Sequence, residues 1–293
     1  MKESDIDPKI FELYDVYCHS AMQRREFLRR AAALTVVGGS GLAMAQALLP
    51  QYAQAQTISF TDKRIKARYV TYPSPGGNAA EMRGYLVQPA GEGPFPSVLI
   101  VHENRGLNPY IEDVARRAAV SGFLALAPDA LTPLGGYPGN DDDGKVMQKK
   151  LDRAKIHIDM LNGARFLKAH AQSTGKLGAT GFCFGGGVTN YLAVQMGAAL
   201  NAAAPFYGRA PNTDGVKDIK AAVLVHYAED DPRVNAMRAD YEAALKAAGA
   251  NYEMHTYPGT RHGFHNNSTL RYNEAAAKLA WQRTIDLFKK QLA

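Results

Sequence analysis

The stretch KLGATGFCFGGGVTNYLA, residues 176–193, decides the fold of this chain. Its apolar first part ends at Phe182 and predicts a buried β-strand, and the residues after Gly185 predict a helix. Cys183 stands at the sharp turn between them, in the pattern G-x-C-x-G that begins at Gly181. This pattern is typical of a nucleophile elbow, with cysteine where serine is usual. The helix N-terminus that follows favours a thiolate and a developing oxyanion alike.

Alternating strand and helix patterns surround this turn. We expect strands at residues 64–72, 82–88, 97–102, 123–128, 177–182, 202–207, 221–227 and 251–257. We expect helices at residues 110–121, 147–170, 186–197, 235–248 and 272–291, and an irregular surface loop at 131–145. The first two strands are amphipathic and predict an antiparallel edge hairpin, whereas the apolar middle strands indicate a parallel sheet covered on both faces. The sequence therefore predicts one α/β domain over residues 57–293, with helices on both faces of a mostly parallel sheet.

A nucleophile of this kind needs a base and an acid that orients the base. In the hydrolase fold both follow the nucleophile along the chain, the acid after a later strand and the histidine before the last helix. Asp230 and Asp231 stand at the end of the strand 221–227, and His262 lies in the loop before the last helix. Taken singly, the aspartates suit an Asp-Asp-Pro turn and His262 suits an exposed loop. The order of all three favours a triad.

Other histidines are less suited to the role of base. His226 falls within a buried strand pattern, and His102 ends a strand beside the predicted site. His265 is the rival base but lies farther from the strand end. The histidines lack the H-x-x-x-H or cysteine-paired spacing of metal sites, so we expect neither a metal nor a cofactor.

The loop VHENRG, residues 101–106, follows a buried strand. In a hydrolase fold this loop supplies the second N–H group of an oxyanion hole. We expect the backbone N–H groups of Asn104 and Phe184 to share that task. Glu103 should lie close to the thiol of Cys183, where its carboxylate disfavours a thiolate or accepts the thiol proton. A salt bridge from Glu103 to Arg105 or Arg116 is the structural alternative.

The first 56 residues differ in character from the rest. QRREFLRR at 23–30 precedes an uncharged run at 31–49, and AQAQ at 53–56 has the small residues of a signal-peptidase site. This arrangement resembles a twin-arginine export signal and predicts a leader over residues 1–56, recognition by the twin-arginine machinery and a periplasmic location. The alternatives are a membrane anchor at 31–49 and a retained segment of a cytoplasmic protein. After signal cleavage we expect no stable membrane insertion.

A long stretch precedes the arginine pair. PKIFELYDVYCHS, residues 8–20, has apolar residues at helical spacing. These are Ile10, Leu13, Tyr14 and Tyr17. The pattern predicts either a helix within the leader or a translation start at Met22.

The chain has two cysteines, Cys18 and Cys183. Cleavage of the leader would leave Cys183 alone and preclude an internal disulfide. A lone thiol is a liability in an oxidising compartment, so its presence favours a chemical role over that of a small buried hydrophobe. The net charge of +6 is spread without basic runs interleaved with aromatic residues, which argues against nucleic-acid binding and leaves a small molecule as the partner.

Together these residues resemble the dienelactone hydrolase family, a branch of the α/β-hydrolases with a Cys-Asp-His triad. The motifs that carry the resemblance are VHENRG, GFCFGGG, AEDDPRVN and HGFHN. Matched position by position, it implies that Cys183 is the nucleophile, His262 the base and Asp231, rather than Asp230, the acid. It also implies that Glu103 keeps the resting thiol quiet until substrate displaces it.

The sequence departs from the family where substrate is held. Members that act on dienelactones bind the substrate carboxylate with two arginines, but here Asn266 stands four residues after His262 and Asp141 or a neighbour takes the other position. The candidates to replace them are Arg105, Arg209, Arg233 and Arg261. Of these, we predict Arg105 and Arg261 as substrate-binding residues.

Residues and resemblance together predict a hydrolase that cleaves an ester or lactone through a thioester on Cys183. Thiolate is a strong nucleophile and a good leaving group, which suits activated esters and lactones better than amides. A thiol acyltransferase and a non-catalytic binding protein with a hydrolase fold are the alternatives. A redox sensor would need a resolving cysteine, which the chain lacks once the leader is removed.

Overall fold

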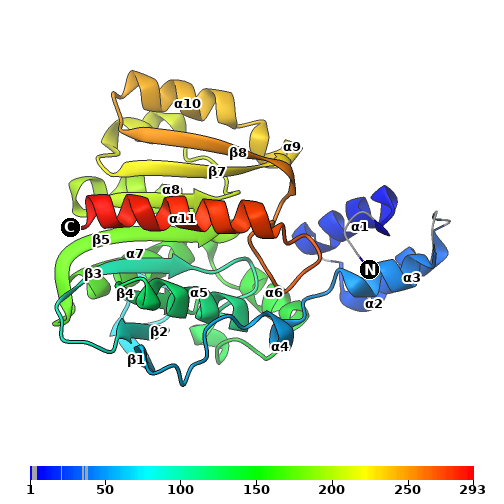
Figure 1. The fold of residues 1–293 in the computed structure, drawn as a ribbon, viewed down its shortest axis with the longest axis horizontal. Helices are drawn as coiled ribbons and strands as arrows, with labels where there is room; N and C mark the ends of the chain where they lie inside the picture. Colours follow the sequence, from blue (N-terminus) through cyan, green and yellow to red (C-terminus); the bar gives the residue numbers. More distant parts are fainter. Residues whose placement is uncertain (2–4, 21, 35, 37–38) are drawn as a thin grey trace.

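The fold is that of a computed structural model, which describes residues 1, 5–20, 22–34, 36 and 39–293. An eight-stranded sheet has the strand order β1-β2-β4-β3-β5-β6-β7-β8 (Figure 1). The strands are β1 Ile65–Pro73, β2 Glu81–Pro89, β3 Phe95–Val101, β4 Leu124–Pro128, β5 Ser173–Phe182, β6 Ala202–Phe206, β7 Ala222–Asp230 and β8 Tyr252–Arg261. The β1–β2 and β2–β4 pairs are antiparallel and the remaining pairs are parallel. The predicted mostly parallel α/β sheet with an antiparallel N-terminal hairpin is confirmed.

Helices cover both faces of this sheet. They are α5 Pro109–Val120, α6 Asp141–Lys150, α7 Arg153–Lys168, α8 Phe184–Met196, α9 Pro232–Asn235, α10 Arg238–Ala247 and α11 Glu274–Gln291. Short 3-10 turns lie at Thr132–Leu134, Gly197–Ala199 and Thr213–Asp218. Buried apolar residues of α5 and α11 form one core cluster with the sheet, and those of α7, α8 and α10 form the other. Apolar strands sandwiched in this way bury both faces, which is why they lack alternating polar residues.

The structure corrects two predicted boundaries. The single helix expected at 147–170 is two helices, because α6 ends at Lys150 and Asp152 caps a new helix by accepting from the N–H groups of Ala154 and Lys155. The loop expected to reach residue 145 ends earlier. Asn140 caps α6 by accepting from the N–H of Asp143, and three aspartates in the first turn complement the helix dipole. Those aspartates were wrongly assigned to irregular structure.

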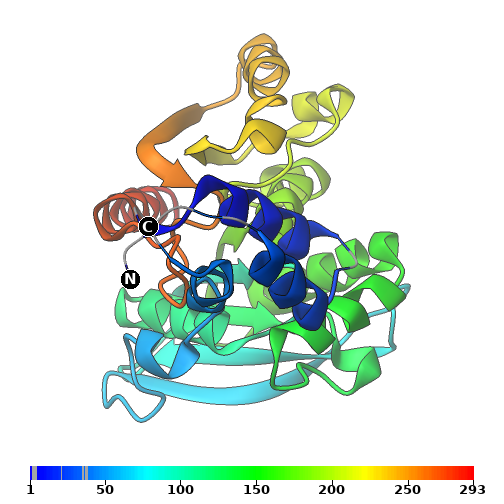
Figure 2. The ribbon, with the colours of Figure 1, turned by 90° about the vertical axis from the view of Figure 1, so that its right-hand side faces the viewer.

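Among the residues that the structure describes, four further helices precede the sheet: α1 Pro8–His19, α2 Arg24–Ala33, α3 Gly41–Ala47 and α4 Tyr52–Ala55. The helix predicted within the leader is thus present as α1, which begins at Pro8 with Asp7 as its cap. Its buried residues join those of α2 and α3 in a third apolar cluster, separate from the two sheet cores. Helices α1 to α3 lie together across one end of the sheet (Figure 2). Within the described residues, no helix is both long and apolar enough to cross a membrane.

Candidate active site

The turn between β5 and α8 has the geometry that its glycines predict. Cys183 has φ 56° and ψ −112°, a backbone region that costs a non-glycine residue free energy. A Cβ atom on Gly185 would lie 2.2 Å from the Val101 carbonyl oxygen, and one on Gly181 would lie 2.3 Å from the Gly185 carbonyl oxygen. Only glycine permits α8 to begin this close to β3. The close approach holds Cys183 at the apex, as the N-cap residue of α8.

A second element of the site joins the ends of β7 and β8. His262 Nδ1 donates a hydrogen bond to Asp231 Oδ2 at 2.5 Å, and both side chains are more than nine-tenths buried. Asp231 also caps α9, accepting from the Val234 N–H at 3.4 Å. Asp230 turns outward instead and forms an ion pair with Arg261, with about half of its side chain exposed. The geometry therefore pairs His262 with Asp231 and not with Asp230.

The thiol lies beside this pair. Cys183 Sγ and a ring nitrogen of His262 are within 4.8 Å of each other. Since Nδ1 is bonded to Asp231, Nε2 is the nitrogen left to face the thiol. That Nε2 is buried and has no hydrogen-bond partner in the described part of the chain. The structure thus brings together the three residues predicted as a triad.

Charge within this group favours a thiolate. Burial by itself raises the pKa of Cys183, but the positive charge of His262 and contact with His19 hold that pKa well below its usual value. Burial by itself lowers the pKa of His262, whereas the Cys183 thiolate and the Asp231 hydrogen bond raise it to about 9. Each charge stabilises the other, so the arrangement supports a thiolate–imidazolium pair.

Glu103 is buried and lines the same small space as Cys183. Burial and the negative charge of Cys183 raise the pKa of its carboxyl group. Asn266 Nδ2 donates to Glu103 Oε2 at 3.1 Å. The position where dienelactone-cleaving relatives are expected to carry an arginine therefore holds an amide that binds Glu103. The alternative salt bridges are not formed among the described residues, because Arg105 pairs with Asp141 and Arg116 with acidic residues of α5.

The two predicted oxyanion donors border the thiol. Phe184 is the first residue of α8, where backbone N–H groups have no partner within the helix. Asn104 follows β3, and its side chain donates to the Cys18 carbonyl oxygen at 3.0 Å. Both residues line the same cavity as Cys183 and His262.

Comparison with known proteins identifies the family of this chain. The model of the dienelactone hydrolase family matches residues 82–292, which include the elbow, Asp231 and His262. The chain belongs to the dienelactone hydrolase family. A second family model, described as YqhI-like, matches residues 1–35.

Relatives of this dienelactone hydrolase family member agree with the assignment. A protein of Methylorubrum extorquens named "Putative carboxymethylenebutenolidase" is 31% identical over 90% of this chain and 96% of its own length. The crystal structure titled "Putative Dienelactone Hydrolase" from Klebsiella pneumoniae superposes with a TM-score of 0.65 at 28% identity, covering 76% of this chain and 99% of that one. The crystal structure of a dienelactone hydrolase-like promiscuous phosphotriesterase from metagenomic libraries superposes with a TM-score of 0.68 at 25% identity. The match covers 78% of this chain and 100% of that one. The names in this group support an ester or lactone hydrolase.

Three other histidines of this family member serve the core. His265 is buried and shares a 2.7 Å hydrogen bond with the Tyr110 hydroxyl, so the rival base is already engaged. His226 is bonded to the hydroxyls of Tyr257 and Thr284. His102 Nδ1 donates to the Glu103 carbonyl oxygen at 2.5 Å, and its Nε2 accepts from a backbone N–H. All three have structural partners away from the thiol.

A cavity of about 900 Å³ opens from Cys183. Apolar side chains of α7 and α8 form part of its wall, and no aspartate or glutamate occurs among the described residues that line it. Its cationic residues are Lys145, Lys149, Arg153, Arg209 and Arg233. The two arginines predicted to bind substrate do not line this cavity. Arg105 lines a separate space of about 20 Å³ next to Glu103, and Arg261 lines neither the large cavity nor this small space. The large cavity therefore combines apolar walls with positive charge.

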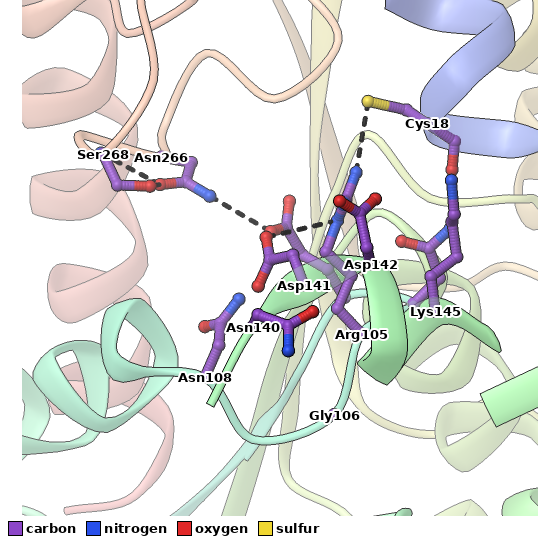
Figure 3. Close-up of polar contacts among 12 residues, drawn as sticks. Cys18, Arg105, Gly106, Asn108, Asn140, Asp141, Asp142, Lys145, Asn266 and Ser268 are labelled. Atoms are coloured by element: carbon purple, nitrogen blue, oxygen red, sulfur yellow. Dashed lines mark hydrogen bonds and ion pairs between the residues drawn. The ribbon is translucent and has the colours of Figure 1, made fainter. Parts of the chain in front are cut away.

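Helix α1 closes one side of the site and is bonded to α6 and the β3 loop. Lys145 Nζ donates to the carbonyl oxygens of Tyr17 and Met22, both at 2.7 Å. Arg105, held between α1 and α6, donates to Cys18 Sγ at 3.2 Å (Figure 3). These contacts make α1 part of the wall around the thiol.

Sequence reasoning missed three residues at the site. His19 of α1 has its Nε2 3.9 Å from Cys183 Sγ. Tyr207 has φ 36°, and its ring centroid is 5.0 Å from that of His262. The Arg271 guanidinium is buried over the Tyr14 ring. The helical pattern of residues 8–20 could have indicated a packed α1, but no spacing relates any of these residues to Cys183.

Proposed function

We propose that this protein hydrolyses an ester or lactone through a covalent thioester on Cys183. The observation that carries the proposal is the buried Asp231–His262 hydrogen bond, with the other nitrogen of His262 facing the thiol at a strained apex. The hydrolase class of the family supports the same chemistry.

In this proposal each residue of the site has a role. Cys183 attacks the substrate carbonyl, and the N–H groups of Asn104 and Phe184 stabilise the oxyanion. Each N–H group lowers the activation barrier by about 3 kcal/mol. His262 gives its proton to the leaving alkoxide as the thioester forms. Neutral His262 then takes a proton from water, which attacks the thioester and releases the acid and the thiolate. Asp231 holds the tautomer of His262 and stabilises the imidazolium.

The substrate that fits this site carries negative charge. Arg209 and Arg233 line the cavity that contains Cys183, and its described lining residues include no acidic side chain. Arg105 lines the small space near Glu103 and is paired with Asp141, and Arg261 is paired with Asp230. Arg209 and Arg233 are thus better placed than Arg105 and Arg261 to bind an anionic group of the substrate.

For location, we propose export through the twin-arginine machinery with residues 1–56 retained, since α1 of this segment forms part of the wall around the thiol. Arg24 and Arg25 are exposed at the first turn of α2, while Phe27 behind them is fully buried. An exposed arginine pair is accessible to a receptor even when α2 is folded.

The test of the activity is rapid mixing of the full chain with an activated aryl ester, followed by intact-mass analysis. We expect a burst of phenol equal to the enzyme concentration and an acyl adduct on Cys183 that clears with time. Cys183→Ala is the control and should give neither. If the wild-type protein is folded and has a titratable thiol but gives no burst, the Glu103→Gln variant is measured in the same way. A burst in Glu103→Gln alone means that Glu103 restrains the thiol, and no burst in either variant rejects the proposal.

A further inference from the structure

We infer that His19, Cys183 and His262 form a binding site for a zinc ion, which holds the nucleophile inactive. The sulfur and the two ring nitrogens come from α1, the elbow and the loop after β8, and lie within 4.8 Å of one another. One thiolate and two imidazoles are ligands that zinc prefers in proteins. The binding site depends on these three side chains alone, and its effect on turnover rests on the proposed function.

The distances suit a tetrahedral ion. Zinc binds sulfur at about 2.3 Å and nitrogen at about 2.0–2.1 Å, so a sulfur and a nitrogen on the same ion lie about 3.6 Å apart. Cys183 Sγ and His19 Nε2 are 3.9 Å apart in the structure. Side-chain adjustments on the order of 1 Å would complete the coordination of all three atoms. All three residues line the large cavity, which leaves the fourth position open to water.

Both imidazoles already have the supporting contacts of metal ligands. His262 Nδ1 is bonded to the Asp231 carboxylate at 2.5 Å. His19 Nδ1 lies 3.1 Å from the Asp15 carboxylate and 2.9 Å from the Asp15 carbonyl oxygen. A histidine that binds metal through one nitrogen generally donates from the other to such oxygens, which fixes the ring and its tautomer.

An independent observation points to a ligand at the same place. His262 is 94% buried, yet its Nε2 has no hydrogen-bond partner in the described part of the chain. A buried polar atom without a partner carries a free-energy cost. A bound cation would replace the Nε2 proton and use the lone pair that it leaves.

Arg233 is the competitor for the site. Its Nη2 lies 3.1 Å from His19 Nε2, so the guanidinium occupies the position beside that nitrogen where a metal would bind. Arg233 is exposed and can swing into solvent. Its removal should therefore strengthen metal binding, an effect opposite to that expected for a ligand.

Binding has a defined chemical balance. In the resting ion pair the proton is on His262 Nε2, so binding forms one Zn–S bond to the thiolate and Zn–N bonds to the two imidazoles, breaks the Nε2–H bond and sends one proton to solvent. No oxidant or reductant is needed. The bound thiolate and His262 Nε2 are then unavailable for attack and proton transfer. Removal of the ion by a chelator restores both groups.

The test is titration of the full chain with Co²⁺, whose thiolate charge-transfer absorption reports a cobalt–sulfur bond, followed by displacement with Zn²⁺. We expect one ion per chain, no such band in Cys183→Ala and an affinity at least ~10-fold lower in His19→Asn. His157→Asn is the matched control, since His157 lines the same cavity but is not one of the three ligands, and its affinity should equal that of wild type. Arg233→Gln should bind more tightly than wild type.

Equal affinity in wild type and His19→Asn, with unchanged circular dichroism, would overturn the site. So would weaker binding in Arg233→Gln. Zinc inhibition of aryl ester hydrolysis, reversed by a chelator, tests the effect on turnover. A cobalt–thiolate band without esterase activity in the metal-free protein would reject the proposed function and leave the metal site standing, so the two failures are distinguishable.

Discussion

His19 and Cys183 are 164 positions apart in the chain, and their side chains meet with Nε2 3.9 Å from Sγ. The contact places an N-terminal helix in the wall of a site whose other parts come from the sheet. It makes residues 5–20 relevant to the chemistry as well as to the location of the protein.

The first prediction separates the two neighbouring aspartates. Asp231→Asn should lower kcat/KM for an activated ester by ~10²- to ~10⁴-fold, because His262 loses the carboxylate that fixes its tautomer and stabilises its charge. Asp230→Asn is the matched control and should change kcat/KM less than about 2-fold, since Asp230 pairs with Arg261 at the surface. Equal losses in the two variants would contradict the assignment.

The second prediction concerns pH. The pKa of Cys183 is held well below its usual value and that of His262 is raised to about 9, so the thiolate–imidazolium pair persists between those two limits. The rate of alkylation of Cys183 by iodoacetamide, followed by peptide mass spectrometry, should be nearly flat from pH ~6 to ~8. In His262→Asn the rate should instead climb with pH, because only the contact with His19 then remains to lower the thiol pKa from its ordinary value of ~8.5. An alkylation rate of wild-type Cys183 that rises with a midpoint at the ordinary pKa of a thiol would rule out the thiolate–imidazolium pair.

The third prediction tests how α1 is attached. Lys145→Met removes two hydrogen bonds from a buried ammonium group to α1 and the residues after it, and should lower the free energy of unfolding by about 1–3 kcal/mol. Hydrogen exchange in residues 8–20 should become faster. Lys149→Met, which removes an exposed ammonium group bonded to the Ser20 carbonyl oxygen, should have a smaller effect. Unchanged exchange in Lys145→Met would mean that the other contacts of α1 are sufficient to hold it.

The fourth prediction concerns substrate charge. Arg209→Gln and Arg233→Gln should each raise KM for a carboxylate-bearing aryl ester by about 3- to 10-fold, a modest factor because both arginines are exposed and screened by solvent. KM for the neutral ester of the same size should stay constant. Arg261→Gln is the control outside the cavity lining. If KM rises as much for the neutral ester, the arginines act through the shape of the cavity instead of its charge.

The fifth prediction tests export. Replacing Arg24 and Arg25 by lysine preserves charge and helix propensity, so α2 should still form. The protein should nevertheless remain in the cytoplasm, as measured by cell fractionation against the wild-type chain. Unchanged export would remove the twin-arginine interpretation.

Local sequence patterns determined much of the fold. Apolar runs and their alternation predicted all eight strands, and the G-x-C-x-G turn located Cys183, because periodicity and turn chemistry depend on near neighbours. The same reasoning failed at Asp141–Asp143, where charge and neighbouring glycines suggested a loop. A single cap, Asn140, and the helix dipole made those residues helical.

Only the tertiary structure decided which distant side chains meet at the thiol. The meeting of Cys183, Asp231 and His262 could be predicted from their order along the chain, because loops after parallel strands share one edge of the sheet. The sequence could not predict that His19, Tyr207 and Arg271 lie at the site. Their positions depend on how α1 and the loops pack and not on any spacing along the chain. The same reason explains why a search for histidine spacing predicted no metal site. Such spacing detects ligands on one helix or turn, whereas these three side chains come from separate elements that folding brings together.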